Sequence, residues 1–327
     1  MVVALNFPNA PAIGDTWPNP PQTGVPTYKW DGTDWLATFA LGKPMVPLDG
    51  SAAMTGPLIL SGDPTLPLGA STKQYVDTLL GSSLSGLTLS ADGATQQFGV
   101  AKGKATDSTA VTSMVLPSAY IKTAASWALG TGTGGLDAGI IAASTWYHVY
   151  LIKRPDTGVV DVVFSLSATA PTLPANYTLF RRIGSLKTNA STQFLKFIQD
   201  GDTFTWDNPP ADISVTNPGT ASLTRTLSTP PGVRVEAIIM IGFGAPAQSD
   251  NPAAIYVSDL LIADRAPSVG TGTLYVYSGS LPVTNASLVT RIFTNLLSQI
   301  RVRLQLSSTN TQFYVVTYGW NDRRGRD

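Results

Sequence analysis

Repeated short apolar runs constrain the fold of this chain more than any other feature. From about residue 85 onward, runs rich in β-branched and aromatic residues alternate with turns of Gly, Asp, Asn and Pro. Such runs suit a pleated, half-buried surface, and their repetition is typical of a sandwich or barrel. The clearest hairpin spans residues 147–166, around the turn Pro155-Asp156-Thr157-Gly158, and a second surrounds Asp200-Gly201. We therefore expect a mainly β chain with a distal, jelly-roll-like β-sandwich over residues 85–327.

Further strands are predicted by the same composition. They cover residues 179–183, 233–243, 255–262, 274–277, 301–306 and 313–320. Residues 285–300 are ambiguous, because their apolar positions fit a helical face and also alternate toward Leu304. Strand is the favoured interpretation there.

The low charge of the chain indicates assembly. Charged residues make up 13% of the sequence and apolar residues 43%, and this charged share is roughly half that of an ordinary globular protein. A surface so poor in charge is expected either to lie in subunit contacts or to be covered with Ser, Thr, Asn and Gly, and assembly is the favoured interpretation. The net charge of zero provides no basic field for nucleic acid or an anionic membrane.

Cysteine is absent from the sequence, which excludes disulfides, thiolate metal sites and cysteine nucleophiles. No apolar run approaches the ~20 residues needed to cross a bilayer, and the first residues lack the basic start and apolar core of a signal peptide. We expect synthesis in the cytoplasm without secretion or membrane insertion.

Residues 1–48 combine eight prolines with six aromatic residues. Prolines at this density exclude a regular helix. Residues 27–37 predict two short strands around an Asp-Gly turn, in a small hairpin module or an arm that orders on a partner. Because linkers are depleted in large apolar side chains, this region is expected to attach to another protein. The candidate attachment residues are Phe7, Trp17, Tyr28, Trp30 and Trp35.

Residues 49–84 predict a turn followed by a short helix. Ser71 or Thr72 can cap the helix and Gly81 can end it. At about ten residues this helix is too short to be stable alone in water. Three copies around a common axis would bury its apolar seam. The expected trimer contacts are Tyr75, Val76, Leu79, Leu80 and Leu84.

Three groups of stretches carry a resemblance to a known family. Residues 54–64 together with 70–77 closely resemble a motif of bacteriophage tail-fibre and related virion proteins. Residues 6–15 and 28–35 look like the N-terminal attachment repeat of such proteins. Residues 103–108, 134–139, 147–154 and 319–327 are similar to a domain of phage structural proteins. The resemblance implies a virion location and a trimer. It implies no receptor and no catalytic residue, and this chain lacks the long shaft repeats of the family.

The sequence offers few candidates for catalysis. His148 is the single histidine, and a sheet-surface or interface role is favoured over a triad or metal site. Asp200, Asp202 and Asp207 are the nearest candidates for the paired carboxylates of a polysaccharide depolymerase. Their setting is ordinary turn chemistry. We expect no catalytic residue, cofactor or metal.

Two basic clusters and four aromatic residues remain. Arg181-Arg182 is expected at a strand edge, and Arg323, Arg324 and Arg326 form a solvated tail or pair with acidic residues of a neighbouring subunit. Aromatic rings and dispersed hydrogen bonds are the usual means of binding sugars. The candidate receptor contacts are Trp127, Trp146, Tyr177 and Trp206, with core packing as the favoured alternative for each.

Together these features predict a non-enzymatic, homotrimeric virion fibre assembled in the bacterial cytoplasm. Its N-terminal region would bind tail, neck or capsid proteins, and its distal domain would attach to the host surface through a glycan. The alternatives are a collar, neck or head decoration fibre without receptor binding, and a polysaccharide depolymerase.

Overall fold

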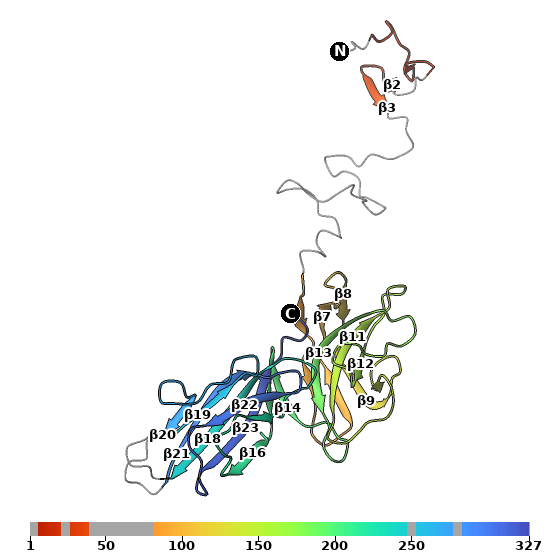
Figure 1. The fold of residues 1–327 in the computed structure, drawn as a ribbon. Helices are drawn as coiled ribbons and strands as arrows, with labels where there is room; N and C mark the ends of the chain where they lie inside the picture. Colours follow the sequence, from red (N-terminus) through yellow and green to blue (C-terminus); the bar gives the residue numbers. More distant parts are fainter. Residues whose placement is uncertain (1–5, 21–26, 39–80, 247–252, 277–282, 327) are drawn as a thin grey trace. The chain divides into compact units, whose positions relative to one another are not determined.

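The regular structure of this computed structural model consists of β-strands. It describes residues 6–20, 27–38, 81–246, 253–276 and 283–326, and within them no helix is present. The mainly β fold is therefore confirmed (Figure 1). The predicted helix falls on residues 71–80, which lie outside the described residues, as does the predicted boundary at residue 48. The chain divides into two compact units, Met1–Gly62 and Asp63–Asp327.

The first unit contains a three-stranded antiparallel sheet. Its strands are β1 (Thr16–Trp17), β2 (Thr27–Trp30) and β3 (Trp35–Thr38), in the order β1-β2-β3. Trp30 and Trp35 form the pair nearest the turn. Gly32 has a φ of +110°, a conformation that favours glycine. The hairpin predicted around Asp31-Gly32 is confirmed.

The second unit begins with a seven-stranded and a three-stranded sheet, here called the first sandwich. The larger sheet has the order β13-β11-β12-β10-β9-β6-β5, and the smaller the order β4-β7-β8. Strand β10 pairs in parallel with β9 and β12. The strands are β4 (Leu84–Gly86), β5 (Leu89–Ser90), β6 (Gln97–Val100), β7 (Gly103–Thr106), β8 (Ser113–Leu116), β9 (Tyr120–Ser126), β10 (Thr133–Leu136), β11 (Trp146–Lys153), β12 (Val160–Ser165) and β13 (Leu179–Lys187).

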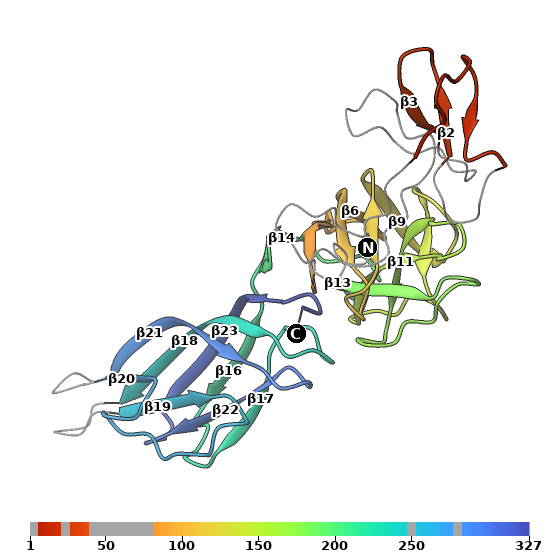
Figure 2. The same cartoon turned by 90° about the horizontal axis from the view of Figure 1, so that it is seen from above.

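A six-stranded and a four-stranded sheet form the second sandwich. The larger has the order β14-β15-β23-β18-β21, with β16 also paired to β23, and the smaller the order β17-β22-β19-β20. The strands are β14 (Phe197–Asp200), β15 (Thr203–Trp206), β16 (Ala211–Thr216), β17 (Leu223–Thr226), β18 (Glu236–Pro246), β19 (Ala253–Ser258), β20 (Leu274–Val276), β21 (Val283–Phe293), β22 (Gln299–Leu304) and β23 (Gln312–Asn321). Figure 2 shows both sandwiches from above.

Both hairpins predicted within residues 85–327 are confirmed. Strands β11 and β12 pair from His148 with Ser165 to Lys153 with Val160, and Gly158 in their turn has a φ of +74°. Strands β14 and β15 pair around Gly201. The ambiguous segment 285–300 is mostly strand, as favoured: β21 ends at Phe293, a turn follows, and β22 begins at Gln299.

Each sandwich encloses its own core. In the second, alternate residues of β22 point inward, and Ile300, Val302 and Leu304 are at most 1% exposed. Burying each of these side chains stabilises the fold by roughly 1.5–3 kcal/mol. The first core is richer in aromatic rings, and it includes Trp320 of β23 at the end of the second sandwich. The two sandwiches therefore share packing where they meet, and Arg324 near the end of the chain lies at this junction. Figures 1 and 2 show the two sandwiches.

Candidate functional site

The predicted attachment residues come together in the first unit. The ring of Phe7 lies 5.0 Å from those of Trp17 and Tyr28 and 5.1 Å from that of Trp35, measured between centroids. Trp30 packs against Trp35 at 5.7 Å. All five side chains are only half-buried. They form a small aromatic core that leaves ring surface accessible to a partner.

The turn of this module is fixed by Asp31. Its carboxylate accepts hydrogen bonds from the backbone N–H groups of Thr33 and Asp34, both at 2.8 Å. These donors, Asp34 first, hold the pKa of the Asp31 carboxyl below its usual range. The local sequence thus determines where the Trp30 and Trp35 rings are presented.

Of the predicted trimer contacts, Tyr75, Val76, Leu79 and Leu80 lie outside the described residues. Leu84 lies in β4, is half-buried and packs against the first core of its own chain. The trimer interface stays a prediction.

Two of the four predicted receptor aromatics, Trp146 and Trp206, lie together. Their rings are 5.7 Å apart, and both contact Trp320, at 5.4 Å and 5.1 Å. Trp206 is 5% exposed, and its indole N–H donates to the carbonyl of Ser228 at 3.1 Å. Trp206 is therefore packed in the core, which was the favoured alternative, whereas Trp146 is half-buried.

The other two, Trp127 and Tyr177, form a separate pair. Their rings meet edge to face at 5.4 Å, and Tyr177 is 5% exposed. The ammonium group of Lys122 lies 5.6 Å from the centroid of the Trp127 ring. This pair packs beside a buried cation, with Tyr177 buried and Trp127 half-buried.

A hollow of about 330 Å³ opens beside Trp206, and we call it the aromatic hollow. Lys196 and Asp207 form an ion pair at 2.9 Å on its half-exposed rim. The ammonium group of Lys187 lies 5.7 Å from the centroid of the Trp146 ring. The lining consists of Asp92, Gly93, Lys187, Leu195, Lys196, Trp206, Asp207, Asn208, Pro210 and Ser228.

Asp92 closes one side of the aromatic hollow. Its carboxylate accepts hydrogen bonds from the backbone N–H groups of Ala94 and Thr95, both at 2.9 Å, and these bonds lower its pKa. Carboxylates, ammonium groups and the amide of Asn208 thus surround one aromatic edge. Such polar groups can hydrogen-bond sugar hydroxyls, and the edge of Trp206 provides an apolar contact beside them.

Most of the candidate catalytic groups are held by other side chains, whereas Asp200 is exposed at the end of β14. His148 is 2% exposed, with Nδ1 3.0 Å from the hydroxyl of Ser185, and burial followed by the charge of Arg182 lowers its pKa to about 4. The predicted strand location is confirmed, but the side chain is buried rather than on a sheet surface. Asp202 is held by ion pairs and Asp207 by Lys196. In the described ranges no three acidic or histidine side chains gather as a metal site would require.

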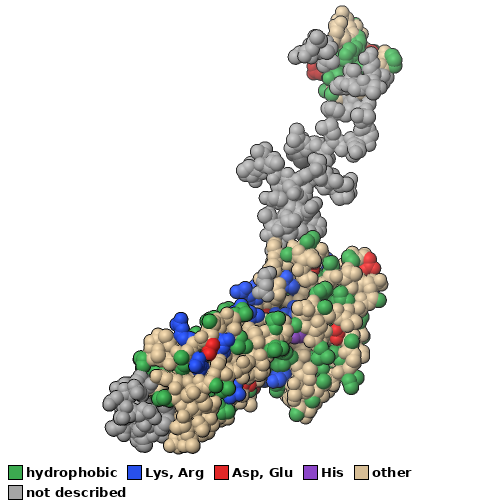
Figure 3. Space-filling view, in the orientation of Figure 1, with side chains coloured by type: hydrophobic (Ala, Val, Ile, Leu, Met, Phe, Trp, Pro, Cys, Tyr) green, Lys and Arg blue, Asp and Glu red, His purple; other side chains and the backbone are tan. Residues whose placement is uncertain are grey.

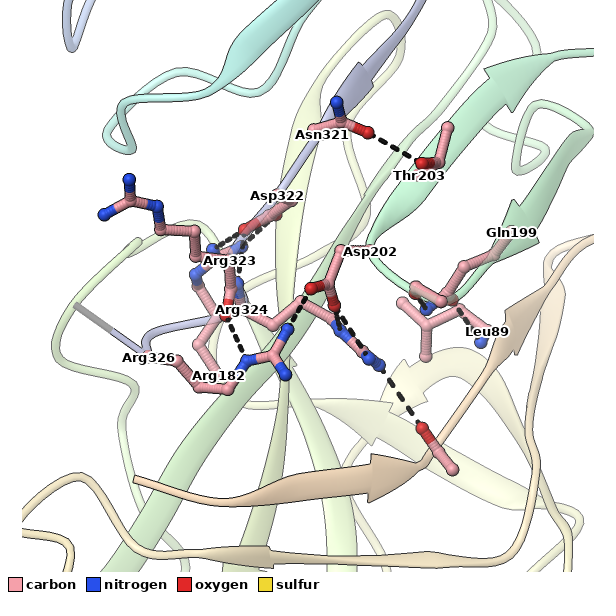
Figure 4. Close-up of polar contacts among 12 residues, drawn as sticks. Leu89, Arg182, Gln199, Asp202, Thr203, Asn321, Asp322, Arg323, Arg324 and Arg326 are labelled. Atoms are coloured by element: carbon pink, nitrogen blue, oxygen red, sulfur yellow. Dashed lines mark hydrogen bonds and ion pairs between the residues drawn. The ribbon is translucent and has the colours of Figure 1, made fainter. Parts of the chain in front are cut away.

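The C-terminal tail corrects one prediction. Its arginines were expected in solvent or paired with a neighbouring subunit, yet Arg324 and Arg326 both form ion pairs with Asp202 of the same chain (Figure 4). Just before them, Asp322 pairs with the buried Arg182 of β13. Strand β13 is at the edge of its sheet, as predicted for Arg181-Arg182. The tail therefore joins the two sandwiches through charge.

Sequence reasoning also missed a buried ion pair. The ammonium group of Lys122 lies 2.9 Å from the carboxylate of Asp161, and both side chains are fully buried. The carbonyl of Ala128 accepts from Lys122 at 2.8 Å, and the N–H of Gly130 donates to Asp161 at 2.9 Å. A lysine and an aspartate within otherwise apolar strands were the only sequence signal.

No protein-family model matches the chain, and no curated protein matches it. In the part of the chain that is described, no helix has the length and apolar character to cross a membrane.

Proposed function

We propose that this chain is a non-enzymatic subunit of a bacteriophage virion fibre, a homotrimer that contributes to attachment to the host surface. The aromatic hollow is the observation that carries the attachment role. It combines the edge of a tryptophan with charged and amide side chains at the surface of a rigid sandwich. The resemblance of residues 54–64 and 70–77 to virion fibre proteins supports the assignment to a fibre.

The N-terminal module is proposed to dock on the tail, neck or capsid in the bacterial cytoplasm. Its support is the half-buried aromatic cluster around Phe7, because exposed aromatic area is enriched at protein interfaces. Of the finer architecture, the trimeric helix and a jelly-roll-like connectivity stay proposals. The two parallel pairings of β10 are a feature that an all-antiparallel jelly roll lacks.

Attachment in this proposal is multivalent. One shallow sugar site binds weakly, but three copies on one fibre raise the effective concentration, and avidity can exceed a single affinity by about 10²–10⁴. The chain needs no chemical step for this function.

Binding of the full-length protein to an array of bacterial surface polysaccharides tests the proposal. Asn208→Trp would fill the aromatic hollow from an exposed position, and Asn310→Trp, on an exposed loop outside the hollow, is the matched control. We expect the wild type and Asn310→Trp to bind one polysaccharide class, and Asn208→Trp to lose at least about tenfold in affinity.

Equal binding by all three proteins would remove the hollow from the attachment role. Failure of the wild type to bind any polysaccharide or to adsorb to host cells would favour a collar, neck or head decoration fibre. The appearance of new reducing ends during incubation would instead identify a depolymerase.

A further inference from the structure

A second hollow, here called the arginine hollow, lies where the two sandwiches meet. Its volume is about 330 Å³, and three arginines line it: Arg181 and Arg182 of β13, and Arg234 just before β18. Among the described residues, no aspartate or glutamate belongs to the lining. Of the residues that the structure describes, three arginines and no carboxylate therefore line this one hollow. Figure 3 shows Lys and Arg side chains near this junction.

The carboxylates that partner these arginines are buried and lie outside the lining. Asp322 forms the ion pair with Arg182 and is 1% exposed, and Asp259 forms the pair with Arg234 and is 7% exposed. Because these carboxylates lie outside the lining, part of the positive potential of the arginines extends into the hollow.

The guanidinium groups are held in place before any ligand arrives. Arg182 donates to both oxygens of Asp322 and, at 3.1 Å, to the hydroxyl of Ser185. Nε of Arg181 donates to the carbonyl of Arg324 at 3.1 Å. Preorganised donors lose little side-chain entropy when they bind an anion.

Arg234 is the guanidinium that a ligand can reach. Its side chain is 45% exposed, and its guanidinium packs over the ring of Phe293 at 4.9 Å. An arginine has five N–H donors in a planar fork, so donors remain beyond the bond to Asp259. Planar bidentate recognition of a carboxylate or phosphate is what this side chain does best.

The remaining walls suit a sugar ring that carries the acid. Phe180 and Leu296 provide apolar surface, and the hydroxyls of Ser108 and Thr169 lie on exposed residues. A flat anion alone would need no apolar wall. A saccharide would use both the wall and the cations.

We propose that the arginine hollow binds the carboxylate or phosphate of an acidic saccharide, with Arg234 as the donor in direct contact and Arg181 and Arg182 supplying the field. This site is separate from the aromatic hollow, because the two linings share no residue. The proposed ligand is an anion, and its binding can be tested independently of the proposed attachment role.

Calorimetric titration of the full-length protein with glucuronate, glucose 6-phosphate and glucose tests the proposal. We expect one or both acids to bind with affinities in about the millimolar range and to weaken with salt, and glucose to bind at least about tenfold more weakly. Binding of glucuronate alone identifies a carboxylate as the source, and binding of glucose 6-phosphate alone identifies a phosphate.

Variants assign the binding to this hollow. Leu296→Glu adds a negative charge at an exposed lining residue without touching a buried ion pair, and Leu129→Glu, also exposed and outside the lining, is its control. Affinity for the acid should fall at least about tenfold in Leu296→Glu and stay unchanged in Leu129→Glu.

Absence of binding by both acids, equal binding of glucose, or an unchanged affinity in Leu296→Glu would overturn the inference. None of these results bears on the polysaccharide array, where variants of Asn208 test the aromatic hollow. Failure of this site and failure of the attachment function are therefore distinguishable.

Discussion

The cores of the two sandwiches are built from different kinds of residue. The second is built from aliphatic side chains at alternating positions, with Phe243 and Phe313 as its aromatic members. The first contains many aromatic rings, and its strands also bury Lys122, Asp161, Arg182 and His148. An aliphatic core is stabilised by the apolar area that it buries, whereas a charged side chain is tolerated in a core only when it is paired.

This difference predicts which substitutions destabilise each sandwich most. The second should lose stability in proportion to the apolar volume removed. The first should be most sensitive to the loss of one partner of an ion pair, because the other partner is left charged in an apolar environment.

The largest effect is expected from Lys122→Met, which leaves the Asp161 carboxylate buried without its cation. The free energy of unfolding should fall by about 4 kcal/mol in urea denaturation followed by tryptophan fluorescence. The double variant Lys122→Met/Asp161→Asn should recover most of this, because a neutral amide oxygen can still accept from Gly130. Lys104→Met, at an exposed position of β7, is the control. A double variant no more stable than the single one would contradict the account.

Ile241→Ala probes the aliphatic core. Ile241 is fully buried in β18, and removing its side chain should cost about 3 kcal/mol through lost burial and the cavity left behind. Val289→Ala in the neighbouring β21, at a side chain 56% exposed, should stay within about 0.5 kcal/mol of the wild type. Equal costs at the two positions would show that the alternation does not define the core.

The pH dependence of stability should come from the first sandwich. The pKa of His148 is lowered to about 4, first by burial, so the unfolded chain takes up a proton at a higher pH than the folded chain. Stability should therefore decrease as pH falls from about 6.5 to about 4, by about 2 kcal/mol between pH 7 and pH 4.5. Thermal or urea unfolding across this range should show a smaller slope in His148→Gln. An identical slope in the variant would assign the dependence to other groups.

The smallest effect is expected at the surface of the second sandwich. Arg303 and Asp264 form an ion pair at 2.8 Å, with side chains 31% and 35% exposed. Arg303→Ala should change the free energy of unfolding by less than about 1 kcal/mol, since solvent screens such pairs. A loss as large as that of Lys122→Met would erase the distinction between exposed and buried pairs.

The alternation of buried and exposed residues could be predicted from the sequence, but the pairs formed by distant side chains could not. The hairpins around Gly158 and Gly201 were predicted because turn residues and β-branched runs are local signals. The aromatic attachment residues were also found, since rings among prolines stand out in composition. The partners of Arg182 and Arg324 are 140 and 122 residues away, and no local pattern reports a contact at that separation.

The same limit explains the candidate sites. Trp146 and Trp206 were singled out as rings near strand ends, but the aromatic hollow also needs Lys187 at the end of β13 and Asp92, more than 100 residues before Trp206. The arginine hollow needs β13, the approach to β18 and the C-terminal tail together. Each of these segments contributes residues of common types, which by themselves do not indicate a binding site.

Three-fold association is the central claim, because multivalent attachment depends on it. Sedimentation equilibrium of the full-length protein tests this most directly. The account predicts a single species of about 103 kDa, three times the 34.4 kDa mass of one chain. A stable species of 34.4 kDa at micromolar concentration would contradict it.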